Sequence, residues 1–555
     1  MDDDGPALSA VAVRAGKRVG GWLPVAIPLG FLLVFFAYPV GAIVVRGLHP
    51  HGRWDLGVVG DVLGSPVYRQ VAWFTLWQAA ASTVVTVVVA MPMAALFARF
   101  EFRGKRVLWS LLLVPFVLPT VVVGAAFLAL LGPRGAVGVN LQGTIWLVLI
   151  AHAFFNVAVV VRTVGGLWSH LDPDLEDAAR SLGASRVRAF REVTLPLLRP
   201  AIAAAASIVF LFCFTSFGII LLLGGSRSRT LEVEIYDQTA RFLHLDVAAV
   251  LAVLQLVGVA AALIIYSRYQ QRRSVQQTLR ARSEVARTPA TVGERGFVVA
   301  TLGLMAALLG LPLAMLVWRS FSTGGFGLNS WRALDSSRRG STLFVSPLDA
   351  VRNSLGFALV ATVIAVVVGG LAAWAVARRP GRGIGWFDAA LMLPLGTSAV
   401  TVGFGFLIAL DRPPLDLRGS LWLVPIAQAT VAVPFVIRTL VPVLRSIDGR
   451  LRDAAAVLGA SPLQIWREVD LPIVFRAVLV SAGFAFAVSL GEFGATVFLA
   501  RSDHPTVPVA IYRFLGQPGP LNLGQAFALS VVLMGVTAGV VLLVDRVRVG
   551  SLGEF

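Results

Sequence analysis

The sequence predicts an all-α polytopic membrane protein with two tandem six-helix transmembrane domains. Of the 555 residues, 57% are hydrophobic and only 14% are charged, and the mean hydropathy is +0.81. Uncharged stretches of roughly 20 residues, the length that a helix needs to cross a bilayer, recur along the whole chain. In addition, several segments of the first half return in the second half at a constant displacement along the sequence. These three observations together predict the fold class.

Twelve uncharged runs are long enough to form transmembrane helices, six in each half. They fall near 22–45, 70–98, 107–132, 143–166, 200–223, 246–267, 297–318, 353–377, 386–410, 420–437, 477–500 and 521–544. Because six is an even number, both halves should cross the membrane in the same direction. A pseudo-two-fold axis along the membrane normal is therefore expected to relate them.

The basic residues predict the orientation in the membrane. Cytoplasmic loops carry an excess of Lys and Arg. With the N-terminus in the cytoplasm, 31 of the 47 Lys and Arg residues fall on that side and 16 on the other. We therefore expect a multi-pass protein of the cell membrane with both termini in the cytoplasm. This bias accounts for the net charge of +17 without nucleic acid, and the single Cys213 implies no disulfide framework.

The predicted organisation follows from these runs and loops. A cytoplasmic tail (1–21) precedes a retained first span, with no signal peptide removed. The first transmembrane domain covers 22–267, with its core repeat from about 70, and the second covers 296–545, with its core repeat from about 350. An Arg-rich cytoplasmic linker (268–295) joins the two domains, and a cytoplasmic tail (546–555) ends the chain.

One inter-helix segment of each half carries the same landmarks. In the first half they are Asp177, Ala178, Ala179, Gly183, Leu195 and Pro196; in the second they are Asp453, Ala454, Ala455, Gly459, Leu471 and Pro472, all at one common displacement. Farther from these segments, Pro115 and Gly124 correspond to Pro394 and Gly403 at a slightly longer displacement. A single copy of this pattern arises by chance in alanine-rich helices, but two copies in register are specific.

Each segment is predicted to form a helix–glycine–helix elbow on the cytoplasmic side, over 172–196 and 448–472. Asp172 and Pro173 suit the N-cap and the first helical position, and Gly183 suits a left-handed C-cap. Ser185 and Ser461 can cap a second short helix, which the Leu-Pro pair closes. The small alanines allow another surface to approach the first helix closely.

The pattern D-A-A-x3-G-x9-V-x-L-P resembles the signature of permease subunits of ATP-binding-cassette (ABC) importers, which more often has Glu for Asp and Ile for Val. The resemblance implies a type I importer fold in which the elbow is a coupling helix seated in a groove of a cytosolic ATPase. It also implies two copies of that ATPase and an extracytoplasmic solute-binding protein. ATP and Mg²⁺ would then be bound by the ATPase, and this chain would hold no cofactor or metal.

Sequence motifs for enzymatic chemistry are missing from the chain. It contains no G-x-x-x-x-G-K-[ST] phosphate loop, no H-E-x-x-H, no C-x-x-C and no nucleophile elbow. We therefore expect a transport subunit that is not an enzyme, with ATP hydrolysis on a separate polypeptide.

A few polar residues inside the predicted spans are candidates for a substrate path. Glu492 lies in the middle of an apolar run, and its counterpart in the first half is Ser216. An ionised group in the membrane needs either a partner or a water-filled cavity. Glu492 therefore either lines a path, or is protonated or bonded to neighbouring helices. His152 and Asn156 are four residues apart and share a helix face, where interhelical hydrogen bonds are the favoured interpretation.

The resemblance also narrows the substrate. The fused arrangement and the segments 151–156, 213–218, 231–236 and 489–494 are similar to thiamine and iron(III) importer permeases. Thiamine or iron(III) is therefore the implied substrate, delivered by the binding protein. The segment 492–496 also resembles sulfate and molybdate permeases, so an oxyanion permease is an alternative, and a polyamine permease is another.

A twelve-span secondary transporter is the alternative from a different class. Proton or sodium coupling normally calls for several ionisable groups within the membrane. Glu492 is the only carboxylate deep in a predicted span, and Asp388 lies near an entrance. Gradient-driven transport by the chain alone, in liposomes without an ATPase, would favour this alternative.

Overall fold

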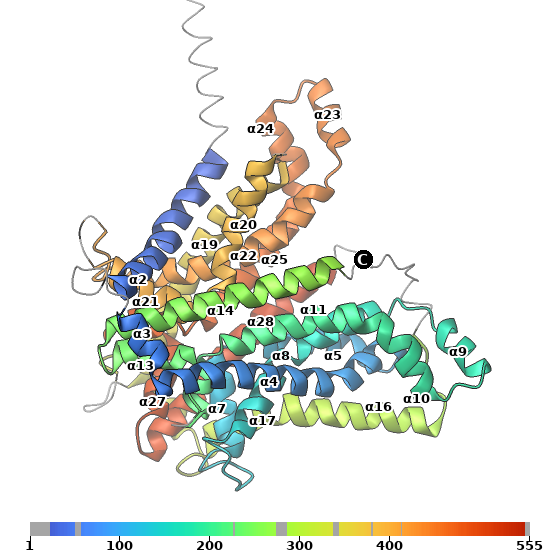
Figure 1. The fold of residues 1–555 in the computed structure, drawn as a ribbon, viewed down its shortest axis with the longest axis horizontal. Coiled ribbons are helices and arrows are strands. Elements are labelled where there is room, and N and C mark those ends of the chain that lie inside the picture. Colours follow the sequence, from blue (N-terminus) through green and yellow to red (C-terminus); the bar gives the residue numbers. More distant parts are fainter. Residues whose placement is uncertain are drawn as a thin grey trace, which may run out of the picture. The chain divides into compact units, whose positions relative to one another are not determined.

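The computed structural model describes residues 23–49, 57–225, 228–272, 286–336, 343–378, 381–411, 413 and 415–549. Over this part of the chain the regular structure is helical, and one isolated bridge pairs Phe100 with Arg287 (Figure 1). The all-α class is therefore confirmed. The predicted tail 1–21, the central part of the linker (273–285) and the last residues of the C-terminal tail (550–555) lie outside the described residues.

Among the described residues, ten helices are long and apolar enough to cross a membrane, and twelve spans result if two bent helix pairs each count as one. The single helices are Leu23–Leu48, Pro66–Arg99, Ile145–Trp168, Arg186–Phe214, Leu245–Tyr266, Val292–Ser322, Pro347–Arg378, Leu423–Ser446, Leu463–Gly491 and Pro520–Val547. They follow the order of the predicted runs, and the bent pairs fall on the third run of each half.

The third run of each half was predicted as one continuous helix, and this prediction is wrong. Lys105–Val117 meets α7 (Thr120–Leu131) at 101°, and Gly383–Gly396 meets α21 (Ala399–Ala409) at 97°. In the first half Pro119 disfavours helical geometry at the residue before it, and Leu118 accordingly has a ψ of 139°. In the second half the Ser398 hydroxyl accepts hydrogen bonds from two backbone N–H groups and starts a new helix.

The fifth and eleventh predicted runs are also interrupted. α11 (Leu195–Phe214) stops before α12 (Gly218–Leu223), and α25 (Leu471–Gly491) stops before α26 (Thr496–Leu499). Each predicted run therefore contains a membrane helix followed by a short second helix.

The chain forms two compact units, which differ from the two halves of the sequence. One unit contains three segments of the described chain: 23–42, 355–499 and 543–549, the last being the end of the final helix. The other contains 43–354 and 500–542. The first helix of each half thus packs in the unit that the other half mainly builds. Phe35, for example, packs against Phe406, and Met305 joins the core of the first-half helices. The predicted domain boundaries along the sequence stay a prediction.

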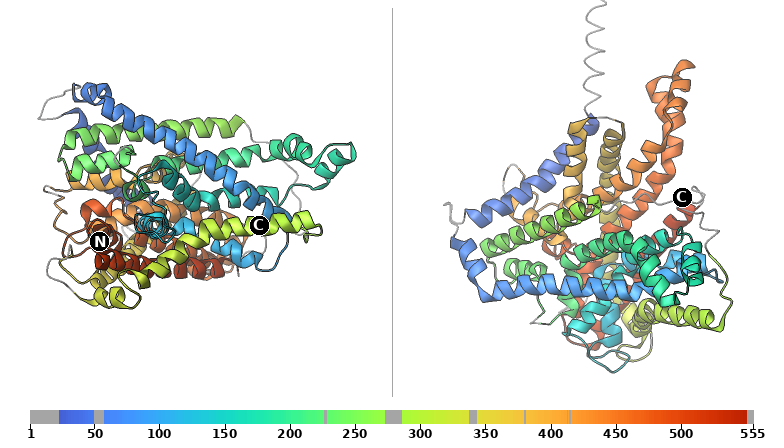
Figure 2. Two further views of the ribbon diagram at one scale, coloured as in Figure 1. Left: turned by 90° about the horizontal axis from the view of Figure 1, so that it is seen from below. Right: turned by 45° about the vertical axis from the view of Figure 1, so that its right-hand side comes forward.

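In the unit built mainly from the first half, α4 (Pro66–Arg99), α8 (Ile145–Trp168) and α11 form a three-helix core (Figures 1 and 2). Small residues let these helices approach closely: a Cβ on Gly165 of α8 would lie 3.3 Å from the Ala94 oxygen of α4. Besides α7, α12 and the two short helices between α8 and α11, this unit contains α3 (Gly57–Gly64), α5 (Lys105–Leu111), α6 (Leu113–Val117), α13 (Leu231–Ala240), α14 (Leu245–Arg272), α16 (Val292–Met305), α17 (Leu311–Ser322), α18 (Asn329–Arg332) and α27 (Val507–Leu515).

The unit built mainly from the second half repeats this design. α19 (Pro347–Arg378), α22 (Leu423–Ser446) and α25 share a core rich in alanine, including Ala365, Ala432 and Ala485. This unit also contains α20 (Arg382–Gly396), α21, α26 and the two short helices between α22 and α25. Three helices contribute residues to both units: α2 (Tyr38–Leu48), α19 and α28 (Pro520–Val549).

Candidate coupling elbows and buried polar residues

The first elbow consists of α9 (Asp174–Ser181) and α10 (Arg186–Ala189), between α8 and α11 (Figure 1). The Asp172 carboxylate accepts the backbone N–H of Asp174 at 3.0 Å. The helix begins one residue later than predicted, so that Pro173 is the N-cap residue in place of Asp172, whose carboxylate still binds the N–H of the first helical residue. The Ser185 hydroxyl accepts the N–H of Arg188 at 3.3 Å, which confirms the predicted cap of α10.

The second elbow consists of α23 (Gly449–Val457) and α24 (Pro462–Ile465). Asp448 caps α23 by accepting the N–H of Arg450 at 3.0 Å. Ser461 and Gln464 exchange hydrogen bonds: the Ser461 N–H donates to Gln464 Oε1 (2.8 Å), and the Gln464 N–H donates to Ser461 Oγ (3.4 Å). This reciprocal pair is a capping box, and it confirms the predicted start of the second short helix.

Both predicted C-cap glycines adopt the left-handed conformation, with φ of +92° at Gly183 and +85° at Gly459. In the first elbow the Gly183 N–H donates to the Arg180 oxygen, and the N–H of the next residue donates to the Ala179 oxygen. The second elbow repeats both bonds at the corresponding residues. This pattern is the Schellman motif, in which glycine at the turn avoids the steric cost of a side chain.

The Leu-Pro pairs do not close the elbows, so that prediction is wrong. Five-residue π-helical turns, η3 (Phe190–Thr194) and η6 (Trp466–Asp470), lead directly into α11 and α25. The Leu195 N–H donates to the Phe190 oxygen, and the Leu471 N–H donates to the Trp466 oxygen. Proline is tolerated in the first turn of the following helix, because its missing N–H needs no partner there. Each elbow is thus joined to the next membrane helix without a loop.

The elbow tips expose apolar side chains. Leu182 is 90% exposed and its counterpart Leu458 is 88% exposed, and Val187 and its counterpart Leu463 are also exposed. Asp177 is exposed and pairs with Arg180 of the same helix at 3.1 Å. Exposed apolar residues gathered at one place mark an interaction surface, so each tip is suited to contact another protein.

The inner sides of the elbows are held by carboxylates. Glu176 of α9 pairs with Arg99 at the end of α4 and accepts the Thr194 hydroxyl. In the second half, Asp470 pairs with Arg378 at 2.8 Å and with Arg452 at 2.7 Å. The sequence pattern did not reveal the two carboxylates, because neither recurs at the corresponding position of the other half.

The structure brings His152, Asn156 and Ser216 together. His152 Nδ1 lies 2.8 Å from Ser82 Oγ, and His152 Nε2 lies 2.8 Å from Ser216 Oγ. Asn156 donates to the His152 oxygen at 3.0 Å, and its Oδ1 has no hydrogen-bond partner among the described residues. His152 and Asn156 are buried in the core of α4, α8 and α11. There His152 makes the favoured interhelical bond to Ser82, and Asn156 also donates to Cys213 Sγ of α11 at 3.6 Å. Their role in a substrate path stays a prediction.

Glu492 is also buried and satisfied within its own unit. Its Oε1 accepts the Ala495 N–H at 2.7 Å, and its Oε2 accepts the Thr496 N–H at 3.0 Å. The carboxylate therefore caps the start of α26, a role that side-chain oxygens commonly have at helix N-termini. This geometry accounts for an acidic residue here without a substrate path.

The first elbow lies in a segment that matches a family of transport proteins. Residues 86–275, which include the first elbow, match the family described as "Binding-protein-dependent transport system inner membrane component". A "Probable ABC transporter permease protein y4fN" of Sinorhizobium fredii is 26% identical, over 97% of this chain and 98% of that protein. The chain is a permease subunit of an ABC importer. As such it lies in the inner membrane with several spans and works with an ATPase and a binding protein.

Further relatives of the permease are named after the substrate that they transport. The "Thiamine transport system permease protein ThiP" of Brucella abortus is 27% identical, over 86% of this chain and 87% of that protein. The protein of the same name from Escherichia coli is 26% identical, with coverages of 80% and 83%. A solved bacterial ABC transporter for import of alginate matches 48% of this chain at 17% identity, with a TM-score of 0.39, too low for a comparison of folds.

Two substitutions at Glu492 of the permease separate capping from a transport role. Glu492→Gln keeps one acceptor oxygen for the start of α26, whereas Glu492→Ala removes both and should cost about 1 kcal/mol, as for lost caps elsewhere. We expect Glu492→Gln to retain solute uptake in proteoliposomes and Glu492→Ala to lower the thermal unfolding midpoint. Loss of uptake in Glu492→Gln, with an unchanged unfolding midpoint, would instead place Glu492 on the substrate path.

Proposed function

We propose that this permease imports thiamine, which an extracytoplasmic binding protein delivers, and that two copies of a cytosolic ATPase drive it. The duplicated elbow is the observation that carries the mechanism: each copy has a glycine-capped turn and an exposed apolar tip. The substrate is supported by the relatives named as thiamine permeases, whose similarity extends over most of both chains. Iron(III) is the alternative substrate of the same proposal.

In this mechanism all ATP hydrolysis takes place on the ATPase, which binds ATP and Mg²⁺. The elbow tips occupy grooves of the ATPase, and movement of each groove is passed to the membrane helices on either side of the elbow. The excess of basic residues in the elbow-side loops supports a cytoplasmic position for both elbows and both termini. The caps at both ends of each elbow's first helix keep the elbow rigid enough to transmit force.

The test is uptake by the reconstituted complex. The permease is co-purified with its ATPase, placed in proteoliposomes and supplied with binding protein and labelled thiamine, iron(III), sulfate or 2-aminoethylphosphonate. The last compound is included because a half-length relative from Salmonella paratyphi A is named for its transport. We expect thiamine uptake that requires ATP, ATPase and binding protein. Uptake of another solute alone would refute the thiamine proposal, and uptake driven by an ion gradient without the ATPase would refute the mechanism.

A further inference from the structure

We propose that each elbow is fixed to the membrane helices by three polar residues, which we call a latch. The two latches have the same function, although the acidic and basic residues occupy different positions in them. The first latch is Arg99, Glu176 and Thr194, and the second latch is Arg378, Arg452 and Asp470. These are positioning residues for coupling. The inference deepens the proposed function, because it rests on the elbows as the point where the ATPase acts.

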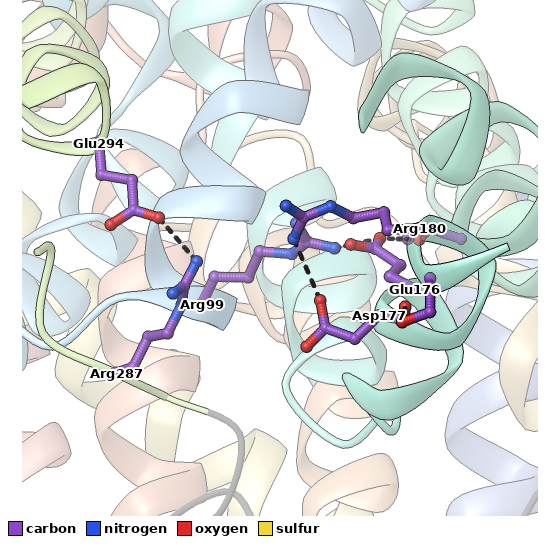
Figure 3. A network of polar contacts seen from close by, with 8 residues as sticks. Arg99, Glu176, Asp177, Arg180, Arg287 and Glu294 are labelled. Carbon is purple, nitrogen blue, oxygen red and sulfur yellow. Dashed lines mark hydrogen bonds and ion pairs between the residues drawn. The ribbon is translucent and has the colours of Figure 1, made fainter. Parts of the chain in front are cut away.

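In the first latch one carboxylate joins three segments. Glu176 of α9 contacts the Arg99 guanidinium at the end of α4 and the Thr194 hydroxyl at the end of η3. Figure 3 shows Arg99 reaching Glu176, with Asp177 and Arg180 on the same elbow helix. The Arg99 guanidinium also lies 5.2 Å from the ring centre of Trp168, the last residue of α8. The elbow helix is thereby tied to the ends of α4 and α8 and to the entrance of α11.

The second latch joins the corresponding segments with the carboxylate in another place. Asp470, at the end of η6, accepts from Arg378 at the end of α19 (2.8 Å) and from Arg452 on α23 (2.7 Å). The Asp470 side chain is only 7% exposed. Because charge-assisted bonds in a partly buried place are screened less by salt and water, they are stronger than bonds on an open surface.

The latch positions correspond between the halves although most of their residues differ. Glu176 and Thr194 match Arg452 and Asp470 at the displacement that relates the two elbows. Arg99 matches Arg378 at the slightly longer displacement found upstream of the elbows. In the first latch the carboxylate (Glu176) is on the elbow helix. In the second latch the carboxylate (Asp470) is on the π turn, and an arginine (Arg452) is at the elbow-helix position. In both halves a single carboxylate, which offers two acceptor oxygens, connects the end of a membrane helix to the elbow.

The latches are needed because packing does not hold the elbow helices in place. Every residue of α9 and α23 is described by the structure, and none of them is buried. Burial of apolar surface, which fixes most short helices, therefore cannot set their orientation. With the latch closed, a push on the elbow tip moves the ends of two membrane helices together. With it open, movement would still reach the following membrane helix through the continuous π turn, but the end of α4 or α19 would no longer move with it.

The test transplants the second latch into the first half of the full transporter with its ATPase and binding protein. Glu176→Arg removes the carboxylate and places two arginines side by side, and Glu176→Arg/Thr194→Asp rebuilds the arrangement of the second latch. Both are assayed in proteoliposomes for solute imported per ATP hydrolysed, a ratio that does not depend on the amount of protein. We expect Glu176→Arg to lower this ratio about tenfold, because it leaves part-buried charges without a partner. We expect the double variant to recover to within about twofold of the unsubstituted protein.

The reciprocal experiment uses the other elbow. Asp470→Thr should uncouple transport, and Asp470→Thr/Arg452→Glu should restore it by copying the first latch. Should Glu176→Arg prove too unstable to purify, Glu176→Gln supplies the single variant, with a smaller expected drop. Double variants as defective as the single ones, or single variants with normal coupling, would overturn the latch proposal. Failure of the unsubstituted complex to import any solute would count against the proposed function instead.

Discussion

Replacing Gly183 and Gly459 together by valine is expected to abolish solute uptake while the ATPase still hydrolyses ATP. Both glycines have φ near +90°, a conformation that costs a β-branched residue about 1–2 kcal/mol or more. Apart from chain neighbours, no heavy atom of the described residues lies within 4 Å of a Cβ built at either position. The defect would therefore come from the backbone turn itself, because the valine side chains have open space around them.

Asparagine at the same two positions is the matched control. It tolerates the left-handed conformation far better than valine and occurs naturally at this position of helix C-caps. Gly183→Asn/Gly459→Asn should therefore import at close to the normal rate. Uptake per ATP hydrolysed, measured in proteoliposomes beside the amount of inserted protein, distinguishes loss of coupling from loss of folding. Normal uptake in the double valine variant would show that the glycine turns are dispensable for coupling.

The features that the sequence predicted correctly are those that depend on neighbouring residues. A cap needs a Ser or Asp next to a helix start, and a left-handed turn needs glycine after a helix end. Ser185, Ser461, Gly183 and Gly459 could therefore be assigned from local pattern. The internal repeat also showed which residues of the two elbows correspond, because each landmark of the first elbow recurs at one constant displacement in the second.

One missed feature is local: the break in the third span of the first half lies at Leu118-Pro119, which apolar run length alone does not detect. The other missed features depend on partners far away in the chain. The exchange of first helices between the two compact units depends on packing across hundreds of residues. The latches could not be predicted from the repeat, because Glu176 corresponds to Arg452. A comparison of the two halves for identical residues does not select this position. Compensating charges can be found only when the three positions are considered together.

The second large expected effect is a loss of stability when a glycine at a close helix contact is replaced by alanine. Gly124 on α7 and Gly403 on α21 occupy corresponding positions of the repeat, and each faces the short helix that follows the fifth or eleventh span. A Cβ at Gly403 would lie 2.6 Å from the Ala495 Cα and 2.9 Å from its oxygen. A Cβ at Gly124 would lie 2.5 Å from Leu222 Cδ1. The obstacle at Gly403 is rigid backbone. At Gly124 it is mainly the end of the Leu222 side chain, although Leu222 Cβ would also lie 3.2 Å away.

This difference predicts unequal effects of the same substitution. Gly403→Ala must displace the backbone at the start of α26, and we expect it to cost about 1–3 kcal/mol, as overpacking does in other cores. In Gly124→Ala a rotamer change of Leu222 removes the Cδ1 contact and leaves only the 3.2 Å approach to its Cβ, so the cost should be smaller, about 1 kcal/mol. Thermal unfolding of the two variants in the same detergent measures the contrast. Equal midpoints would mean that the approach of α26 to α21 is no tighter than that of α12 to α7, whereas a lower midpoint for Gly403→Ala identifies α21 and α26 as the more closely packed pair.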